Sequence, residues 1–387
     1  MQNLEHFLLN PDVTFLNFGS FGACPKPVFE EYQRFQLELE QDPVQFITVK
    51  GINYIRESRE ALANYLNCAA DDLVYTPNPT FAINIVAKNL VLRPGDEVLS
   101  TDLEYGAMDR TWNYYCKQQG AKFIRQHISL PLESKEAFTE SFWKGYSGKT
   151  KAVFISQITS TTGLIFPVKE ICAEAKKRGL ITIVDGAHVP GHIPLDLSGL
   201  EADFYTGACH KWMLTPKGSS FLFVKKEFQS SLDPLVVSWG YDNGPSDTQF
   251  LDYHQFNGTR DFSAYLTIPK AIAFMEEHNW WQVAADSRKL VRSNVQRFCD
   301  LLGTQPLAPV TDEFFGQLAS IPVQTSDPAG LKAELFNRYK IEIPVMPHGQ
   351  QNYLRYSVNA FNDQKDLDKL YEAVEDLMKK GKLLMPV

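Results

Sequence analysis

The sequence has few cysteines, and their spacing matches no common metal-binding or disulfide pattern. Its six cysteines are widely scattered, and no two of them make a C-x-x-C pair. This spacing excludes a dense disulfide framework and argues against structural zinc. We therefore expect no metal site, and we expect reduced thiols in a cytoplasmic compartment.

Long apolar runs and concentrated charge are also missing. No stretch of about 18 uninterrupted apolar residues occurs, and residues 1–13 lack the basic and apolar regions of an export signal. The net charge of −8 is spread along the chain without a long acidic or basic run. We therefore expect neither a membrane nor a nucleic acid as a partner.

The remaining composition is that of an ordinary globular protein, with 44% hydrophobic and 22% charged residues. A chain of 387 residues is longer than a single core usually supports, so we expect two folding units. From Tyr75 to Val224, short apolar runs alternate with helix-like segments, which is typical of a mostly parallel sheet covered by helices. The strands expected there are 97–101, 122–128, 151–156 and 181–185, with helices at 81–86, 106–119 and 168–178.

Beyond Ile268 the pattern changes to long amphipathic segments with strand-like runs between them. The amphipathic segments are 269–302, 327–339 and 364–380, and the strand-like runs are 318–323, 342–345 and 353–358. We predict an α/β fold with a large domain, 15–268, and a smaller α+β domain made of 1–14 and 269–387.

Asp185 ends the apolar run Ile181-Thr182-Ile183-Val184. The carboxyl ends of strands are where open α/β sheets place their ligands, so this carboxylate is expected at a crevice. An Asp in this position can equally cap a helix or a turn, and the residue alone leaves both interpretations open.

Lys211 follows a second apolar strand that begins at Phe204. Lysines are usually solvated at the surface. Here the neighbours Cys209, Trp212 and Met213 make a poor surface, and a partly desolvated amine is what Schiff-base chemistry requires. Lys211 is therefore a candidate for the same crevice as Asp185, with an ordinary surface lysine as the alternative.

Asn78-Pro79-Thr80 precedes an apolar helix and offers an N-cap residue, Pro at the first helical position, a hydroxyl and free backbone amides. The motif alone indicates only a helix start. Together with Asp185 and Lys211 it suits pyridoxal 5′-phosphate (PLP), which needs a carboxylate at its ring nitrogen, a lysine for its aldehyde and an anion site for its phosphate.

Seven short segments, spread over nearly the whole chain, form a specific set. They are Phe15-Leu16-Asn17-Phe18-Gly19-Ser20-Phe21-Gly22, Thr76-Pro77-Asn78-Pro79-Thr80, Glu104-Tyr105-Gly106-Ala107, Thr159-Ser160-Thr161-Thr162-Gly163, Asp185-Gly186-Ala187-His188, His210-Lys211-Trp212 and Gly258-Thr259-Arg260-Asp261. As a set they resemble the class V aminotransferase-like, fold-type I PLP enzymes, and within these the isopenicillin N epimerase-like branch. The resemblance implies that fold, with PLP as the cofactor.

The resemblance also implies roles for single residues. Tyr105 matches the residue that stacks on the pyridine ring, and His188 matches a side chain near the 3′-oxygen of the cofactor. His210 matches a phosphate or neighbouring contact, and Ser160 falls among the cofactor-binding residues. Without the resemblance, Tyr105 would be an ordinary half-buried tyrosine and the histidines would be satisfied core or surface groups.

One position departs from the related cysteine desulfurases, where a serine three residues before the lysine binds phosphate. Here that residue is Ala208, so part of the phosphate site must come from elsewhere. The resemblance points to Gly258 and Thr259, whose loop often reaches the phosphate of the neighbouring subunit. This implies a homodimer with active sites at the subunit interface. A simple Asn-Gly turn at Asn257 is the alternative.

Arg355 is embedded in the alternating strand Asn352-Tyr353-Leu354-Arg355-Tyr356. Its planar guanidinium suits a substrate α-carboxylate, and the family commonly binds the carboxylate with an arginine at this place. A surface ion pair is the alternative. Asn17 and Ser20 are weaker candidates for lining the substrate side.

The expected activity is that of a PLP enzyme acting on an amino acid through a Schiff base on Lys211, either epimerase- or racemase-like or an aminotransferase. Lys211 would remove the α-proton, and Tyr105 or a neighbour would serve the opposite face of an epimerase. A desulfurase-like lyase is the alternative. Protein-persulfide chemistry is disfavoured because no cysteine follows Cys299. A non-catalytic PLP-binding sensor is less well supported, because Lys211 is retained.

Overall fold

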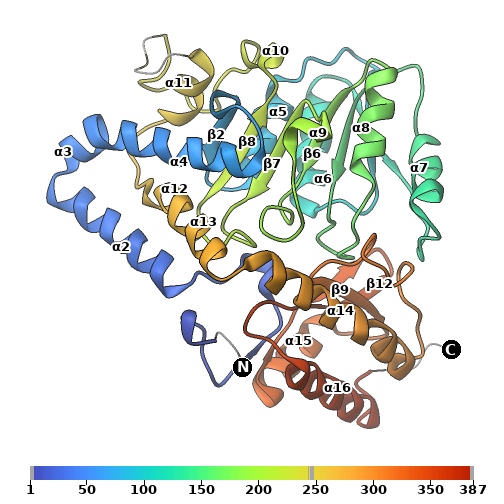
Figure 1. The fold of residues 1–387 in the computed structure, drawn as a ribbon. Coiled ribbons are helices and arrows are strands. Elements are labelled where there is room, and N and C mark those ends of the chain that lie inside the picture. Colours follow the sequence, from blue (N-terminus) through green and yellow to red (C-terminus); the bar gives the residue numbers. More distant parts are fainter. Residues whose placement is uncertain (1–3, 243, 245–247, 384–387) are drawn as a thin grey trace.

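A seven-stranded sheet forms the centre of the larger part of the molecule in the computed structural model, which describes residues 4–242, 244 and 248–383 (Figure 1). The strand order is β2-β8-β7-β6-β5-β3-β4. The neighbours from β7 to β4 are parallel, whereas β8 is antiparallel to both β7 and β2. The predicted mostly parallel sheet is confirmed. Its strands are β2 (Leu73–Thr76), β3 (Glu97–Thr101), β4 (Lys122–Gln126), β5 (Thr150–Ser156), β6 (Ile181–Asp185), β7 (Phe204–Ala208) and β8 (Ser220–Val224).

Helices cover both faces of this sheet, because successive side chains of its buried strands point to opposite sides. In β6, Ile183 joins the core on one face, which holds α5 (Pro79–Asn89) and α6 (Gly106–Gln118). The next residue, Val184, joins the core that includes α8 (Val168–Lys177). The other helices of this part are α7 (Lys135–Trp143), α9 (Leu197–Leu200), α10 (Lys226–Gln229), α11 (Gln249–Gln255) and α12 (Ser263–Leu266).

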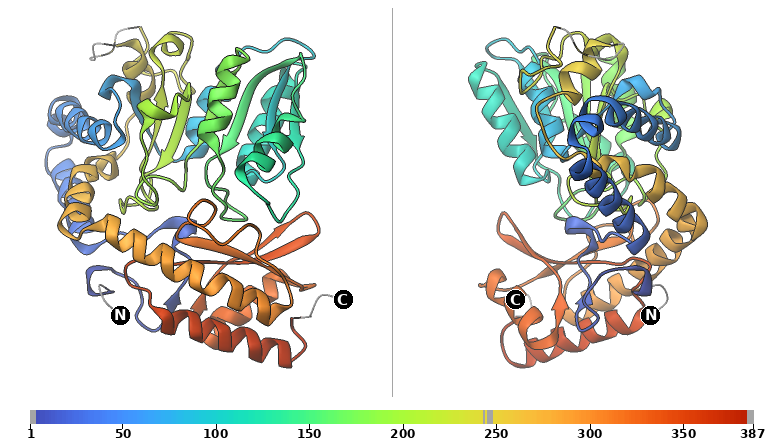
Figure 2. Two further views of the ribbon diagram at one scale, coloured as in Figure 1. Left: turned by 45° about the vertical axis from the view of Figure 1, so that its right-hand side comes forward. Right: turned by 90° about the vertical axis from the view of Figure 1, so that its left-hand side faces the viewer.

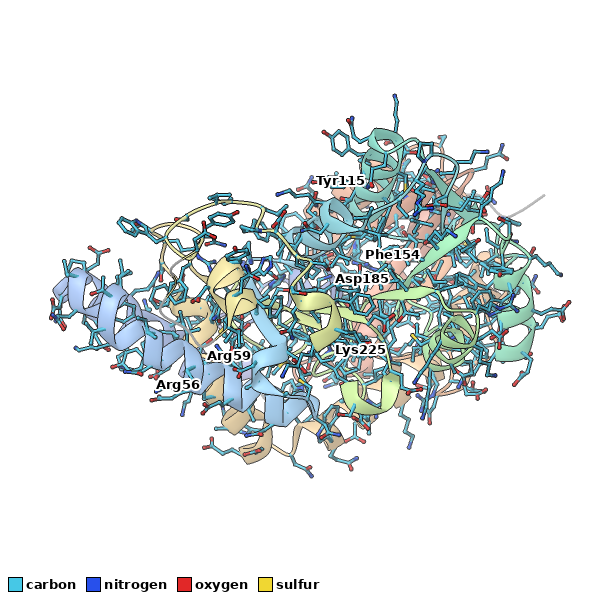
Figure 3. The ribbon with its side chains drawn as sticks, turned by 90° about the horizontal axis from the view of Figure 1, so that it is seen from above. Arg56, Arg59, Tyr115, Phe154, Asp185 and Lys225 are labelled. Atoms are coloured by element: carbon cyan, nitrogen blue, oxygen red, sulfur yellow. The ribbon has the colours of Figure 1, made fainter. Side chains whose placement is uncertain are left out.

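A view from above shows where this buried sheet lies relative to the outer helices (Figure 3). Phe154 of β5 and Asp185 of β6 lie amid the layers, whereas Arg56 lies on an outlying helix. Asp185 is the last residue of its strand. The carboxyl edge of the sheet therefore brings this side chain into the interior of the molecule.

The smaller sheet is antiparallel, with the order β11-β12-β9. Figure 2 shows it below the large sheet, with α16 on its far side. Helix α14 packs along β9, and α14 and α16 contact each other. The elements are α13 (Ile268–Glu277), α14 (Trp280–Leu302), β9 (Leu318–Val323), α15 (Pro328–Tyr339), β10 (Ile341–Glu342), β11 (Val345–His348), β12 (Gln351–Ser357) and α16 (Gln364–Lys379).

The segment before β2 joins the two sheets. Strand β1 pairs in parallel with β10 at Thr14 and Ile341, and the backbone amide of Ser357 donates to Leu16 O at 2.9 Å. Residues 14–20 therefore lie against β10 and β12, just before the long helices begin. The elements here are η1 (Leu4–His6), β1 (Thr14–Phe15), α1 (Phe18–Phe21), α2 (Lys26–Gln41), α3 (Pro43–Gln45), η2 (Phe46–Lys50), α4 (Gly51–Leu66) and η3 (Ala70–Asp72).

Two expectations for the later part of the chain are wrong in detail. The run 342–345 is not one strand: β10 ends at Glu342 and β11 begins at Val345. Pro344 lies between them and has no N–H for a strand ladder. The amphipathic segment 269–302 is broken into α13 and α14 at Asn279, which has a left-handed φ of 46°.

The division into domains 15–268 and 1–14 with 269–387 stays a prediction, and residues 1–3 and 384–387 of it lie outside the described residues. Within the part of the chain that the structure describes, no helix combines the length and the apolar character that crossing a membrane requires.

Candidate active site

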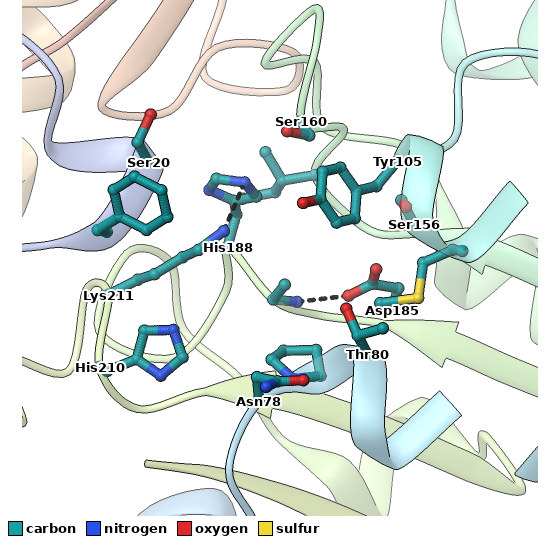
Figure 4. Close-up of a pocket in the computed structure, with 15 residues that line it drawn as sticks. Ser20, Asn78, Thr80, Tyr105, Ser156, Ser160, Asp185, His188, His210 and Lys211 are labelled. Atoms are coloured by element: carbon teal, nitrogen blue, oxygen red, sulfur yellow. Dashed lines mark hydrogen bonds between the residues drawn. The ribbon is translucent and has the colours of Figure 1, made fainter. Parts of the chain in front are cut away.

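A cavity of about 420 Å³ lies at the carboxyl ends of β5 and β6, beside the first turn of α5. This volume suits a small-molecule ligand. Ten of the residues singled out from the sequence line it: Ser20, Asn78, Pro79, Thr80, Tyr105, Ser160, Asp185, His188, His210 and Lys211. Figure 4 shows these side chains gathered around one space.

Asp185 supplies a buried carboxylate, with 3% of its surface exposed. Its Oδ1 accepts a hydrogen bond from the Ala187 amide at 2.8 Å. Burial raises the pKa of Asp185, while this amide and the charge of Lys211 oppose the rise. The turn after the strand requires glycine, because a Cβ on Gly186 would lie 2.0 Å from the Tyr205 hydroxyl. The backbone therefore holds the carboxylate tightly at the cavity wall.

Lys211 lies in the turn that follows β7, and its amine reaches into the cavity (Figure 4). Its neighbours Trp212 and Met213 are completely buried, which draws the lysine inward. Burial, followed by the charge of Arg355, lowers the pKa of Lys211 to about 8, while Asp185 opposes the shift. A pKa of about 8 leaves roughly a tenth of this amine uncharged at pH 7, far more than in an ordinary lysine, and the uncharged form is the one that acts as a nucleophile or a base.

His188 connects Lys211 to the core. Its Nε2 lies 3.1 Å from Lys211 Nζ, and its Nδ1 accepts from the indole N–H of Trp212 at 3.3 Å. Burial and the nearby charges of Lys211 and Arg355 hold the pKa of His188 well below its usual range. The ring is therefore neutral.

His210 lines the cavity with one ring nitrogen already occupied, because its Nδ1 lies 2.7 Å from the carbonyl oxygen of Ser219. Burial lowers the pKa of His210 to about 4. A carbonyl can only accept, so Nδ1 carries the proton of the neutral ring and Nε2 remains for a ligand.

The first turn of α5 forms the anion-binding side of the cavity. Asn78 is the N-cap residue, its Oδ1 accepts from the Phe81 amide at 2.9 Å, and Pro79 occupies the first turn. The predicted helix start is confirmed. The amide of Phe81 is thereby used, so the Thr80 hydroxyl, the Asn78 side-chain NH₂ and the positive end of the helix dipole remain for an anion.

Arg355, on β12, is a buried cation without a carboxylate partner among the described residues. Its NH2 donates to Ser20 Oγ at 2.9 Å, and its NH1 donates to the carbonyl and hydroxyl oxygens of Ser160. Its Nε has no partner in the part of the chain that the structure describes. Burial lowers its pKa to about 10. A buried guanidinium with an unused donor is suited to an anionic group.

Asn17 lies behind this arginine, outside the cavity lining. The Ser20 hydroxyl donates to its Oδ1 at 2.5 Å, and its Nδ2 donates to Glu342 at 3.2 Å. Asn17 therefore orients Ser20, and Ser20 in turn contacts Arg355.

Sequence reasoning did not single out five further lining residues: Phe21, Met108, Ser156, Ile158 and Ala187. Ser156 had a signal, because it ends β5 and lies in register with Asp185. Met108 lies one helical turn beyond Tyr105, which is 45% exposed at the start of α6.

Glu104 is a buried carboxyl group beneath the cavity. It accepts from the Thr101 hydroxyl at 2.8 Å and from the Ser156 amide at 3.1 Å. Burial raises its pKa to about 7, while these hydrogen bonds oppose the rise. It holds the lining residue Ser156 in place.

Gly258 and Thr259 do not line this cavity. They line a second, largely apolar hollow of about 560 Å³ together with Ile47, Ile52, Trp239 and Phe256. Gly258 has a φ of 111°, as a glycine turn requires. In the single chain this loop therefore does not complete the first cavity.

The chain resembles known proteins over almost its entire length. The family model described as aminotransferase class V matches residues 23–370. The isopenicillin N epimerase of Amycolatopsis lactamdurans is 33% identical, over 97% of this chain and 98% of its own. The putative L-cysteine desulfhydrase 1 of Oryza sativa subsp. japonica is 27% identical, over 95% of this chain and 83% of its own.

A solved structure has the same fold. It is that of a C-DES mutant with glycine covalently linked to its PLP cofactor, with a TM-score of 0.82 and 21% identity, and the match covers 97% of this chain and 100% of that one.

Proposed function

The chain belongs to the class V aminotransferase family and is a PLP-dependent enzyme, and we propose that its active site is the cavity shared by Asp185 and Lys211. One observation carries this proposal. A buried carboxylate at the end of β6 and a buried amine of lowered pKa after β7 line the same cavity, beside the capped start of α5.

The groups around the cavity match the chemical groups of PLP. Lys211 would hold the aldehyde carbon, and Asp185 would hold the ring nitrogen with its proton. Thr80 and the first turn of α5 would hold the phosphate, with His210 beside them. Tyr105 and His188 border the remaining space. The fit rests on the chemistry of the groups present: the described residues place a buried carboxylate, a buried amine of lowered pKa and a helix start at a single cavity.

When bound, PLP supplies an electron sink that stabilises negative charge at the Cα of an amino acid. Arg355 binds the α-carboxylate, because its guanidinium is buried and its Nε is unused among the described residues. Lys211 moves the proton at Cα, for which a pKa of about 8 is well matched to neutral pH. Tyr105, with its half-exposed ring, is the candidate for proton delivery from another direction.

We favour epimerisation or racemisation of an amino acid, with transamination as the other outcome that this site supports. The support for epimerisation is the isopenicillin N epimerase that matches at 33% identity over 97% of this chain and 98% of its own. This relationship does not extend to its substrate, because side-chain pockets change while the fold is kept.

A lyase reaction is the second candidate, supported by the similarity to the rice L-cysteine desulfhydrase. A lyase reaction that transfers sulfur to a cysteine of the protein to form a persulfide has little support. None of the six cysteines lines the cavity, and burial raises the pKa of Cys24, Cys68 and Cys209 to about 12.

The protein purified with PLP should be yellow, and amino acids screened in D₂O should distinguish the reactions. Epimerisation exchanges the α-proton and inverts Cα without forming keto acid. Transamination yields keto acid and the amine form of the cofactor, and a lyase releases a side-chain fragment. Loss of all exchange in every amino acid tested, with PLP bound, would contradict the proposal.

Replacing Lys211 should identify the base. Lys211→Ala should lower α-proton exchange by about 10²- to 10⁴-fold, the usual effect of losing a general acid–base group. Lys144→Ala is the matched control, because Lys144 is an exposed lysine in a surface ion pair with Glu140 at 3.7 Å. It should retain the full rate. Equal rates in the two variants would assign the proton transfer to another residue.

We further propose that the enzyme is a homodimer in which Gly258 and Thr259 reach the phosphate site of the partner subunit. The apolar hollow that they line supports this, as do the nearby exposed side chains of Val237 and Trp239, which are 68% and 91% exposed. A cytoplasmic location is proposed as well, and the six free cysteines support it.

A further inference from the structure

Trp212 has no room to move next to the proposed active site. It is completely buried, and its ring stacks on His192 with centroids 4.1 Å apart and lies 4.9 Å from Phe18. In this position its indole N–H donates to Nδ1 of His188 at 3.3 Å. Trp212 thus connects the rigid core directly to a residue of the cavity.

His192 fixes the ring on which Trp212 stacks. Its Nε2 accepts from the Gln317 amide at 2.5 Å, and its Nδ1 lies 2.8 Å from the carbonyl oxygen of His188. Both ring nitrogens of His192 are therefore occupied, and its plane is set by two separate segments of backbone. This immobile surface holds the indole in the orientation that points its N–H at His188.

The hydrogen bond from Trp212 determines which nitrogen of His188 carries the proton. An indole N–H can only donate, so Nδ1 of His188 must present a lone pair. A neutral imidazole has one proton, which must then be on Nε2. That nitrogen lies 3.1 Å from Lys211 Nζ.

We propose that Trp212 is a positioning residue that holds His188 in the Nε2–H tautomer, so that His188 presents a donor and not an acceptor to Lys211. The donor faces the lone pair of the uncharged Lys211 amine and thereby favours this form. The opposite tautomer would present a lone pair and favour the ammonium form. Trp212 thus acts on Lys211 through His188.

The consequence for the reaction rests on the proposed function. With its Nδ1 engaged by Trp212 and a proton on Nε2, His188 cannot take a proton from a substrate. It can only donate a hydrogen bond toward Lys211 or toward a group bound in the cavity. Lys211 is left as the base on this side.

The chain provides a matched control in Trp280. This residue is 3% exposed and belongs to the same apolar cluster as Trp212. Its Nε1 has no hydrogen-bond partner in the part of the chain that the structure describes. Trp280→Phe therefore removes the same N–H and a similar volume as Trp212→Phe, without touching His188.

The tautomer can be measured by ¹⁵N NMR of the full-length protein with labelled histidine, as purified and after removal of PLP. The His188 signal is assigned by its loss in His188→Gln. In the PLP-free wild type, above the Lys211 pKa of about 8, we expect a protonated Nε2 and an unprotonated Nδ1. In Trp212→Phe the ratio of the two tautomers should move about fivefold toward Nδ1–H, the usual net effect of losing one hydrogen bond. Trp280→Phe should match the wild type.

A second readout reports the effect on Lys211. The rate at which added PLP forms the yellow species depends on the uncharged amine, so its pH profile should move to higher pH in Trp212→Phe and stay unchanged in Trp280→Phe. If Trp212 had only a structural role, Trp212→Phe and Trp280→Phe would have similar effects on the tautomer ratio and on this pH profile.

The inference is overturned by a wild-type His188 that carries its proton on Nδ1, a result that stands even when Trp212→Phe fails to fold. An unchanged tautomer ratio in a folded Trp212→Phe also overturns it. The NMR result does not depend on catalysis. A protein that shows the expected tautomer but does not bind PLP would therefore contradict the proposed function and leave this inference standing.

Discussion

Three influences act on the pKa of the Lys211 amine, and they do not act in the same direction. Burial and the positive charge of Arg355 lower its pKa, and Asp185 raises it. The resulting pKa of about 8 lies well below the 10.5 of an ordinary lysine. In the proposed site, attachment of PLP to Lys211 requires the uncharged amine, so this shift would determine how fast the cofactor-free protein is loaded near neutral pH.

The pH dependence of loading should show this shift. The rate of PLP attachment should rise with pH and level off above an apparent pKa of about 8. Arg355→Leu removes a positive charge that lowers the pKa of Lys211, so the midpoint should move to higher pH. Stopped-flow absorbance measures the rate. Arg110→Leu, at an exposed arginine of α6, should leave the midpoint in place, and a wild-type midpoint near 10 would contradict the electrostatic argument.

The residues that sequence analysis could place are those in local motifs. Asp185 and Lys211 each end or follow an apolar strand, and Asn78 precedes a helix, so neighbouring residues alone predict where they lie. Glu104, Phe21 and the hydrogen bond from Trp212 to His188 depend on segments that meet only in the folded chain. No local spacing predicts such contacts. Ile158 likewise has no local signal and joins the cavity only through the fold.

Helix α5 has two functions at its first turn, because Asn78 caps the helix and also borders the cavity. These functions can be separated with a second capped helix. Ser134 caps α7 by accepting from the Ala137 amide at 3.1 Å and does not line the cavity.

Asn78→Ala and Ser134→Ala should each reduce the free energy of unfolding by about 1 kcal/mol, because each removes an N-cap. Only Asn78→Ala should also weaken PLP binding, by about tenfold, because a polar contact to the phosphate is lost. Thermal unfolding and equilibrium titration with PLP measure the two effects. Equal PLP affinity in both variants would remove α5 from the phosphate site.

Element boundaries were predicted well where the apolar pattern is strong. Strands β3 and β6 begin and end at the expected residues, and α6 and α8 differ from the expected bounds by one residue at the C-terminal end. The split between β10 and β11 was missed, because Pro344 interrupts a run whose side-chain pattern continues. Local hydrophobicity records which side chains are buried, but not which partner strand each segment pairs with.

The proposed dimer would differ from the single chain at the surface around Trp239. Trp239 is 91% exposed beside the apolar hollow that contains Gly258 and Thr259. In the proposed dimer this side chain is buried, and the loop at Gly258 completes the partner's phosphate site. The phosphate contact that a serine makes in the related cysteine desulfurases, and that Ala208 cannot make, would then come from the other subunit.

Trp239→Asp should dissociate the dimer and weaken PLP binding at the same time. Loss of a central interface aromatic typically raises the dissociation constant by at least about 30-fold. Analytical ultracentrifugation across protein concentrations measures this change. Tyr114→Asp is the control, at an aromatic residue that is 57% exposed on α6, and it should remain dimeric. A wild-type protein that sediments as a monomer at micromolar concentration would refute the shared site.

The parallel pairing of β1 with β10 has a consequence for biosynthesis. Ser20 lies just after β1 and contacts Arg355 on β12, so the proposed carboxylate-binding group joins an early segment to a late one. A ribosome that adds about 5–20 residues per second needs about 7 to 29 seconds to travel from Lys211 to Arg355. A nascent chain can therefore display its reactive lysine before it can hold a substrate, and amino-acid turnover must await nearly complete translation.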